Sequence, residues 1–506
     1  MENLSALAQT IVKTMEQMMR AGHSHVPAEN LIKAVRKRKS ANNSQLAQAL
    51  QETLDVHVLV QTTLPTGETV IYQPRMLQME KSVAKRLKSI AASKASLSPS
   101  KLKATLKRIA SSSTLSDEQF AAVQGSIANK LSVLTGGPGT GKTTTLKAVL
   151  DLAQHMYLTV ALCAPTGQAA KRLTQPTGCE ATTIHRLLRY NPEEKDFGYN
   201  AGHRLSEDLI VIDESSMIDL WLLHHLLRAV KDSACLLFVG DIHQLPSVGA
   251  GNVLHDIIQS GVASVFNLTT IFRQGEDSHI VTNAQAINTG EMPNLSNQSQ
   301  DFFMFRVPTE QIGKMVSDIV ANRIPDNFGY APEDIQVLTP MYKGVAGVDD
   351  INQRLQAHLT DSSWCVQLKQ GRFKVGDRVV QTKNNYDDNV MNGEVGQIAF
   401  IDKKKKTITI QFDAERVVYS YKKMWQIKLA YAITTHRSQG SEYAAVVLPI
   451  HEGMSQMLQR NLPYTAITRA KKLVVLVGSD EAVQQAIRNV SATERWTALA
   501  SRIGQL

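Results

Sequence analysis

The chain has 506 residues, 43% of them hydrophobic, which is enough for three or four globular domains with buried cores and excludes a disordered chain. Lys and Arg number 55 against 46 Asp and Glu, and the resulting charge of +9 suits a polyanionic partner without proving one. Four scattered cysteines argue against a disulfide framework or a metal cluster, and no apolar run approaches the about 20 residues of a membrane helix. We therefore expect a globular protein of the reducing cytoplasm with no membrane contact.

The first segment, residues 1–113, combines helical periodicity with a later pair of strands. Apolar residues recur at helical spacing in "ENLIKAVRKRK" and "SQLAQALQETL", and two β-rich runs flank a Pro-Thr-Gly turn in "VHVLVQTTLPTGETVIYQP". Helices followed by a hairpin resemble a winged helix. The Ser- and Lys-rich stretch "LKSIAASKASLSPSKLKATLKRIASSSTLS" is predicted to lead into the next module.

The rest of the chain predicts an α/β fold with two parallel-sheet lobes. In residues 114–266 the runs "LSVLT", "TVALCAP", "LIVIDE" and "CLLFVGD" each precede a helical stretch, which is the alternation of a parallel sheet. A second alternating region, residues 267–506, contains "IQVLTP", "AAVVLPI" and "LVVLVG". Within it, residues 369–424 are a run of short strands separated by turns, which predicts a small β-barrel insert.

A glycine-rich loop lies between the first of these strands and a helix. It fits the pattern G-x-x-x-x-G-K-T, in which backbone N–H groups turn onto phosphate oxygens at the positive end of a helix. Lys142 is expected to reach the β and γ phosphates, and Thr143 is expected to ligate magnesium. The residues expected to hold the nucleotide are Gly136, Gly137, Pro138, Gly139, Thr140, Gly141, Lys142, Thr143 and Thr144.

An acidic pair follows the buried strand in "LIVIDESSM". Asp213 and Glu214 stand at its carboxyl end, where ligands bind in parallel sheets. Asp213 would hold magnesium and Glu214 would polarise the attacking water. The sequence therefore predicts a site that hydrolyses its nucleotide.

Three further side chains are candidates for sensing the γ phosphate. Gln244 follows the strand end in "LLFVGDIHQLPSVGAG", where a helix-capping turn is an equally open interpretation. Arg273 in "LTTIFRQ" and Arg469 in "LPYTAITRAKK" lie in or after the second α/β region, so both could reach the nucleotide only across a lobe interface. That geometry would couple hydrolysis to lobe closure.

The assembled motifs resemble a known family. Their ordered set is similar to the RecD-like DNA helicases of superfamily 1, the branch that moves 5′ to 3′, over residues 115–478. The resemblance implies two RecA-like lobes of the P-loop NTPase class, an SH3-like barrel insert, and ATP and Mg²⁺ as cofactors. The motifs are "DEQFAAV", "GGPGTGKTTT", "APTGQAAKRL", "TTIHRLL", "IDESSM", "GDIHQLPSVGAG", "IFRQ", "VLTPMYKGVAGVDDINQRLQ", "THRSQGSEY" and "YTAITRAKK".

The resemblance also assigns residues. It implies that Gln119 recognises adenine, that Arg273 and Arg469 act as arginine fingers, and that Gly440 and Glu442 couple ATP to DNA. Motif residues that line the single-strand groove in the family would contact mostly phosphate and sugar, as expected for tracking that ignores sequence. They match Pro165, Thr166, Thr183, His185, Thr435, His436 and Gln439.

Two inserts take roles by the same resemblance. Residues 189–207 look like the hairpin that splits the duplex, with Phe197 and Tyr199 as the apolar wedge, although their composition alone favours an exposed polar loop. The insert at 369–424 looks like the SH3-like domain that lies over the translocating strand. Within it, Lys403 to Lys406 are interpreted as a solvated hairpin turn.

The sequence thus predicts a monomeric, ATP-dependent 5′-to-3′ DNA helicase that binds single-stranded DNA and single-strand/duplex junctions. It resembles a short form of the family, without the extra amino-terminal region of longer members. Recombination proteins or single-strand-binding proteins are possible partners. Two alternatives remain open: a RecD-type motor subunit (alpha chain) of an exodeoxyribonuclease V-like recombination complex, and a DNA-binding regulator whose ATPase switches its state.

Overall fold

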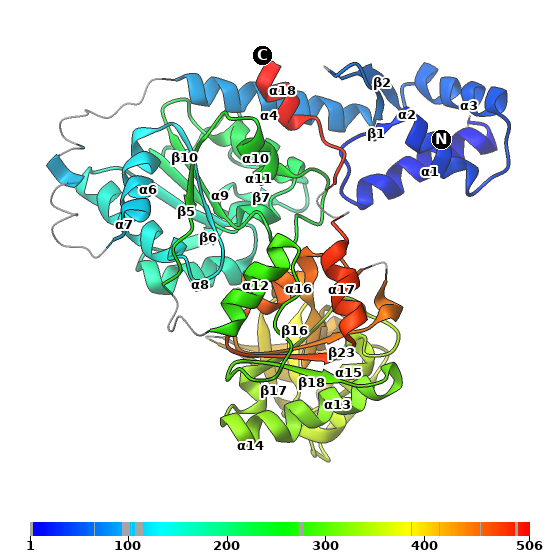
Figure 1. Ribbon diagram of the computed structural model, residues 1–506, viewed down its shortest axis with the longest axis vertical. Helices are drawn as coiled ribbons and strands as arrows, with labels where there is room; N and C mark the ends of the chain where they lie inside the picture. The colour runs from blue at the N-terminus through cyan, green and yellow to red at the C-terminus, as the bar shows by residue number, and fades with distance from the viewer. Residues whose placement is uncertain are drawn as a thin grey trace.

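The chain folds into an N-terminal module, a first α/β lobe, and a second lobe that carries a small β domain (Figure 1). Among the residues that the structure describes, no helix is long and apolar enough to cross a membrane. The structure is a computed structural model that describes residues 4–64, 66–93, 102, 104–106, 115–272, 278–385, 387–413, 415–455, 457–490 and 494–505.

The N-terminal module has the winged-helix order that the sequence predicted. Its elements are α1 (Ala6–Arg20), β1 (Val26–Pro27), α2 (Ala28–Arg36), α3 (Asn43–Asp55), β2 (Val60–Thr63) and β3 (Thr69–Tyr72). The three strands form one sheet in the order β1-β3-β2. Ile11, Met15, Leu31 and Leu46 form a common buried core because the apolar residues of each helix recur on one face.

The first lobe is a six-stranded parallel sheet with helices on both faces. Successive residues of the buried strand β9 point to opposite faces: Ile210 and Ile212 join one core, while Leu209 and Val211 join the other. The sheet order is β11 (Ser264–Leu268), β4 (Leu131–Gly136), β10 (Cys235–Gly240), β9 (Leu209–Ile212), β5 (Val160–Ala164) and β6 (Ala181–Thr183). The helices are α4 (Pro74–Ala92), α6 (Asp117–Ala128), α7 (Lys142–His155), α8 (Gly167–Thr177), α9 (Ile184–Leu187), α10 (Leu220–Ala229) and α11 (Val253–Gln259).

The second lobe is a five-stranded parallel sheet, which confirms the second predicted α/β region. Its order is β12 (Phe302–Arg306), β23 (Ala470–Gly478), β22 (Tyr443–Ile450), β13 (Ile335–Thr339) and β21 (Ala432–Thr434). The helices are α12 (His279–Thr289), α13 (Ile312–Asp318), α14 (Ile324–Phe328), α15 (Val348–Leu359), α16 (Asn461–Ile467) and α17 (Asp480–Arg488).

The β-rich insert folds as five antiparallel strands around its own core, which includes Ile398, Ile410 and Phe412. The strands are β16 (Arg378–Gln381), β17 (Val395–Asp402), β18 (Thr407–Phe412), β19 (Arg416–Ser420) and β20 (Ile427–Leu429), preceded by the hairpin β14 (Cys365–Leu368) and β15 (Gly371–Lys374). The four lysines after Asp402 form the exposed turn between β17 and β18, and the Asp402 carboxylate accepts the amides of Lys404 and Lys405.

The end of the chain returns to the first lobe. The sequence assigned residues 267–506 to the second lobe, and the structure corrects this for α18 (Leu499–Gln505), which packs on α4 and α11. Leu499 and Ile503 are buried in the first lobe's core, and burial of these apolar side chains stabilises the return. We call residues 494–505 the C-terminal clasp.

A buried carboxylate joins the clasp to the N-terminal module. Glu80 of α4 is 0% exposed and accepts hydrogen bonds from the Ser24 hydroxyl at 2.7 Å and the Tyr72 hydroxyl at 2.6 Å. The Arg502 guanidinium donates to the same carboxylate at 3.0 Å, and the Ala498 amide donates at 3.2 Å. A buried charge is tolerated when it is paired and hydrogen-bonded, so these four donors fix the clasp at this position.

The clasp also contacts the turn between α1 and β1. The Trp496 ring stacks on His23 with 4.3 Å between centroids, and the Trp496 amide donates to His23 Nδ1 at 3.0 Å. The Ser24 amide donates to the Trp496 carbonyl at 2.9 Å. His23 must therefore be unprotonated at Nδ1 to accept this bond.

We expect this contact to weaken in acid. Burial, followed by the charge of Arg495, lowers the pKa of His23 to about 4, and burial lowers the pKa of His25 to about 4 as well. Because an unfolded histidine titrates near about 6.5, the stability contributed by the neutral rings is complete above that pH and declines as the pH falls toward 4. Hydrogen exchange at the Ser24 amide, corrected for intrinsic rates, should show protection lost over this window. His23→Gln, which keeps an acceptor but cannot be charged, should show a smaller loss, and an equal loss would contradict the assignment.

Candidate nucleotide and DNA site

The glycine-rich loop turns from β4 into α7, as predicted. Gly139 and Gly141 have φ of 75° and 83°, the left-handed conformation that glycine adopts without a side-chain clash. Lys142 Nζ donates to the carbonyls of Gly136 and Gly137 at 2.7 Å each. Burial lowers the pKa of Lys142, while the carboxylates of Asp241, Glu214 and Asp213 oppose the shift. The lysine is thus a half-buried cation near three carboxylates.

Gln119 lies against this loop. Its side chain and that of Ser116 form a capping box at the start of α6, and its amide nitrogen faces the Thr140 carbonyl at 3.5 Å. A Cβ at Gly141 would lie 2.3 Å from the Gln119 amide nitrogen, so a side chain at this position would displace the Gln119 amide from the loop. Adenine recognition by Gln119 stays a prediction that this position at the loop supports.

Phe272 is a neighbour that the sequence did not single out. It is 51% exposed, and its amide donates to the Gly139 carbonyl at 2.9 Å. Arg273, predicted as an arginine finger, lies outside the described residues.

The predicted magnesium ligands lie in the same cavity. Burial and the adjacent Glu214 carboxylate raise the pKa of Asp213 to about 6, so a cation beside it would stabilise the charged carboxylate. A carboxylate and the Thr143 hydroxyl are the hard oxygen donors that magnesium prefers, and the residues therefore fit the ion. Glu214 has φ of 50°, a conformation that is strained for a residue with a side chain and recurs at functional sites.

The cavity has a volume of about 310 Å³ and is lined by both lobes. From the first lobe it takes the glycine-rich loop, Asp213, Glu214, Asp241 and Gln244, and from the second it takes Glu442, Thr468 and Arg469. A nucleotide held by the loop would therefore contact residues of the second lobe as well.

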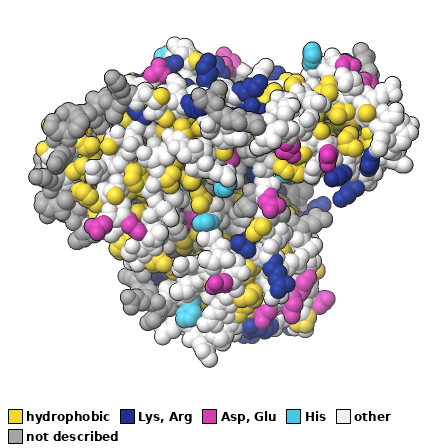
Figure 2. Space-filling model, turned by 45° about the horizontal axis from the view of Figure 1, so that its top comes forward, with side chains coloured by type: hydrophobic (Ala, Val, Ile, Leu, Met, Phe, Trp, Pro, Cys, Tyr) yellow, Lys and Arg dark blue, Asp and Glu magenta, His cyan; other side chains and the backbone are white. Residues whose placement is uncertain are grey.

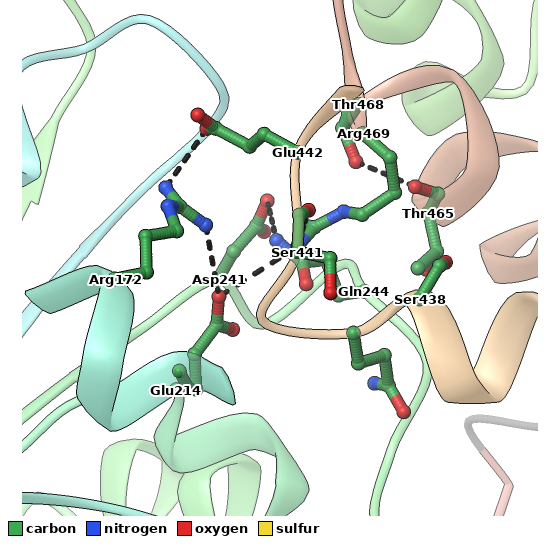
Figure 3. Close-up of polar contacts among 12 residues, drawn as sticks. Arg172, Glu214, Asp241, Gln244, Ser438, Ser441, Glu442, Thr465, Thr468 and Arg469 are labelled. Carbon is green, nitrogen blue, oxygen red and sulfur yellow. Dashed lines mark hydrogen bonds and ion pairs between the residues drawn. The ribbon is translucent and has the colours of Figure 1, made fainter. Parts of the chain in front are cut away.

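Arg469 of the second lobe forms an ion pair with Glu214, the predicted water activator (Figure 3). Its NH1 lies 3.7 Å from Glu214 Oε1 and donates to the Ser441 carbonyl at 3.3 Å. The residue is only 4% exposed, whereas an arginine near the end of a strand or helix is usually a surface charge. The structure therefore brings Arg469 and Glu214 together across the lobe interface, and the role of Arg469 as an arginine finger stays a prediction.

Arg172 of α8 is a functional candidate that sequence reasoning missed. It pairs with Glu442 of the second lobe at 2.8 Å and faces Glu214 at 3.9 Å, as Figure 3 shows. Its motif "APTGQAAKRL" gave the only signal, but an arginine on an amphipathic helix is ordinarily a solvated charge. Glu442, a predicted coupling residue, also lines the candidate nucleotide cavity.

Gln244 lies beside Asp241 at the same interface. Its amide nitrogen faces the Asp241 carboxylate at 3.4 Å, and its backbone carbonyl accepts from Asn461 at 3.3 Å. The same carboxylate accepts from the Tyr464 hydroxyl of the second lobe at 2.7 Å. Gln244 is thus well placed to sense lobe closure, and its role in sensing phosphate stays a prediction.

The predicted groove residues divide into two groups. Thr166 and Thr183 cap α8 and α9, because their hydroxyls accept helix amides at 3.3 and 3.1 Å. Thr435 and Gln439 are buried instead, and Gln439 donates to the Leu245 carbonyl of the first lobe at 2.7 Å. In this structure these two side chains therefore do not line an open groove, and Gln439 joins the lobes. DNA contact by the others, which include Pro165, His185 and His436, stays a prediction.

Gly440 also joins the lobes. It has φ of 77°, and a Cβ there would lie 2.8 Å from the Cβ of Ala169 on α8. The close packing explains why glycine stands in this coupling motif.

The predicted wedge needs a correction. The insert forms a short hairpin, β7 (Tyr190–Asn191) and β8 (Asp196–Phe197), but Phe197 is only 3% exposed. Its ring packs at 4.9 Å from Tyr190 and 5.5 Å from Trp221 between centroids. Phe197 therefore anchors the hairpin in the core, because removing a large aromatic ring from water is more favourable than leaving it exposed at the tip of a loop. Tyr199 is only partly buried, with Arg189 over its ring at 5.0 Å, and stays a candidate for the wedge.

Three parts of the chain match family models. Residues 114–302 match the AAA domain. Residues 351–412 match the SH3 domain of ATP-dependent RecD-like DNA helicases. Residues 429–477 match the UvrD-like helicase C-terminal domain. Their order follows the first lobe, the β insert and the second lobe.

Two relatives and one solved structure are similar to most of the chain. The chain is 35% identical over 493 residues to the ATP-dependent RecD2 DNA helicase of Deinococcus radiodurans, covering 96% of this chain and 66% of the relative's length. It is 32% identical over 424 residues to the RecBCD enzyme subunit RecD of Mycolicibacterium smegmatis, covering 76% of this chain and 75% of the relative. A crystal structure of the Pif1 helicase from Candida albicans aligns with a TM-score of 0.47 and 20% identity over 73% of this chain and 97% of that chain.

Proposed function

The chain belongs to the RecD-like family of DNA helicases, and on that premise we propose that it is an ATP-dependent motor that moves 5′ to 3′ on single-stranded DNA. The motor would unwind the duplex at a single-strand/duplex junction. Its cofactors would be ATP and Mg²⁺, and it would act as a monomer in the cytoplasm. Recombination proteins or single-strand-binding proteins would be its partners.

The observation that carries the proposal is a nucleotide cavity shared by two lobes. Lys142 and the loop amides would hold the phosphates, while Asp213 and Thr143 would hold magnesium. Glu214 would orient the attacking water, and Arg469 would stabilise charge that develops on the transferred group. Because Arg469 comes from the second lobe, hydrolysis requires the closed arrangement of the lobes. Bound magnesium ATP would supply the γ-phosphoryl group that is transferred to water, and this hydrolysis would drive the opening and closing of the lobes.

A second candidate is a motor subunit of a larger recombination complex. The 32% identity to a RecBCD enzyme subunit favours it. Such a subunit would hydrolyse ATP with DNA but unwind poorly in isolation. An ATP-switched DNA binder, the third possibility, would bind DNA stoichiometrically without movement.

Strand displacement tests these candidates. Duplexes with either a 5′ or a 3′ single-stranded tail are incubated with the protein, ATP and Mg²⁺, and DNA-stimulated ATPase is measured in parallel. Unwinding from the 5′ tail alone supports the proposed motor and its direction, whereas unwinding from the 3′ tail alone overturns the direction. ATPase activity without unwinding from either tail favours the subunit or the switch.

The hairpin provides a sharper prediction. Tyr199→Ala should reduce unwinding severalfold while DNA-stimulated ATPase is retained, because its ring lies outside the nucleotide cavity. Phe197→Ala should instead destabilise the fold by about 3–5 kcal/mol, as expected for a buried aromatic side chain. Strand displacement and thermal unfolding of both variants separate the two roles. Normal unwinding by a folded Tyr199→Ala protein would refute the wedge.

A further inference from the structure

The N-terminal module exposes a polar face on its third helix. Helix α3 buries Leu46 and Ala49, and its beginning is fixed by a capping box between Asn42 and Gln45. Most of its exposed side chains are short and polar or carry amides, and these are Asn43, Ser44, Gln45, Gln48 and Gln51. Ala47 and Asp55 are exposed as well, and the Gln51 amide donates to the Asp55 carboxylate at 2.7 Å. Amide side chains pair with base edges in the major groove, most readily with adenine.

A basic run precedes this helix. Arg36, Lys37, Arg38 and Lys39 are consecutive and exposed at the end of α2 and in the turn to α3. Arg36 contacts Asn43, and Arg38 faces the Thr14 hydroxyl at 3.5 Å, so these two side chains help hold the module together. Figure 2 shows Lys and Arg side chains gathered along the lower edge of the N-terminal module.

Lys37 and Lys39 differ from their arginine neighbours. Their side chains make no hydrogen bond or ion pair to any of the described residues. Two solvated ammonium groups are therefore available to bind phosphates, and each bound phosphate releases counterions.

The module is fixed beside the candidate DNA site. The Gly251 amide donates to the Gly22 carbonyl at 2.9 Å, which joins the module to the loop that follows Gln244. The Arg495 guanidinium of the clasp donates to the carbonyls of Gly249 at 3.0 Å and Gly251 at 2.8 Å. The module and the clasp are therefore bonded to the same loop of the first lobe.

We propose that the N-terminal module binds duplex DNA, with α3 in the major groove and Lys37 and Lys39 on the phosphate backbone. In a winged helix the third helix is the one that enters the groove, and the segment before it crosses the backbone. The inference rests on the proposed function, because a motor at a junction has duplex ahead of it. The module would hold that duplex while the lobes move along the single strand.

The chemistry favours duplex DNA over an acidic protein surface. Phosphate contacts position a protein on DNA, and polar groups at the base edges add a second set of hydrogen bonds. The exposed face has both kinds of group next to each other, cations in the turn and amides on the first turns of α3. An acidic protein would use only the cations.

The test uses the full-length chain and a blunt-ended duplex without single-stranded tails. Fluorescence anisotropy at several salt concentrations measures the Kd for this duplex and for a single strand of the same length. Lys37→Glu with Lys39→Glu should weaken duplex binding about tenfold or more and reduce the slope of log K against log salt by about two. ATPase activity stimulated by single-stranded DNA should be unchanged, since neither lysine lines the nucleotide cavity.

A matched pair controls for net charge. Lys81→Glu with Lys85→Glu makes the same change on exposed positions of α4, which lies on the side of the first lobe away from the second lobe (Figure 1). This control should bind the duplex like the wild type. Gln48→Glu should also weaken duplex binding, because it adds a negative charge to the centre of the proposed groove face.

Four results would overturn the proposal. The first is a wild-type protein that has ATPase activity but no measurable duplex binding. The second is an equal loss of duplex affinity in the two double-lysine variants, and the third is an equal loss of affinity for duplex and for single strand in the Lys37 and Lys39 variant. The fourth is a Gln48→Glu variant that binds the duplex like the wild type. The first would leave the surface to a protein partner. Because ATPase activity and 5′-tail unwinding are measured separately, failure of this proposal is distinguishable from failure of the proposed function.

Discussion

Replacing Lys142 by alanine should reduce ATP turnover at least about a hundredfold, the scale of losing one group that stabilises developing charge. The half-buried side chain lies among Asp213, Glu214 and Asp241, and it is the one lysine among the described residues that line the cavity. Binding of single-stranded DNA should change little, because the predicted groove residues lie outside this cavity. Steady-state ATPase and anisotropy with a labelled single strand measure the two effects on one preparation.

The control for this variant is on the same helix. Lys147 is exposed on α7, and Lys147→Ala should retain normal turnover and DNA binding. Loss of DNA binding in Lys142→Ala equal to its loss of turnover would contradict the separation of the two sites. Thermal unfolding distinguishes that outcome from a misfolded variant.

Arg469→Ala should reduce turnover about a thousandfold, since a guanidinium that stabilises the transferred phosphoryl group contributes on that scale. Nucleotide binding should be retained, because the phosphate loop belongs to the first lobe alone. The variant should also fail to unwind DNA, since Arg469 stands at the contact between lobes. A fluorescent ATP analogue measures binding, and phosphate release measures hydrolysis.

Two further variants make this test specific. Arg469→Lys keeps the charge but loses the planar donor group, so it should recover only a small part of the turnover. Arg488→Ala removes an exposed arginine from α17 of the same lobe and should be silent. Equal loss of nucleotide binding and hydrolysis in Arg469→Ala would show that the residue holds ground-state nucleotide and does not act as a finger.

Patterns within short segments of the sequence were sufficient to predict much of the fold and of the candidate site. The glycine-rich loop and Asp213 follow from strand ends, because residues at the carboxyl ends of parallel strands meet at one edge of a sheet. The alternation of apolar runs and helices gave both lobes. The β insert followed from its short strands and turns.

Contacts between segments that are far apart in the sequence could not be predicted from such short patterns. Phe197 looks like the apolar tip of a polar loop, yet a pocket formed with Trp221 buries it. Glu80 fits the solvated face of an amphipathic helix, and only the return of Arg502 makes it a buried pair. Arg172 and Glu442 are 270 residues apart, and their pairing depends on how the two lobes close.

The return of the clasp has a mechanical consequence. The second lobe is inserted into the first, so the chain passes between the lobes twice. Phe272, just before the first passage, is bonded to the phosphate loop, while Arg495, just after the second, is bonded to the loop that contains Gly249. Both connections are therefore bonded to the first lobe at the residues that adjoin them, and two separate attachments restrict twisting of one lobe against the other.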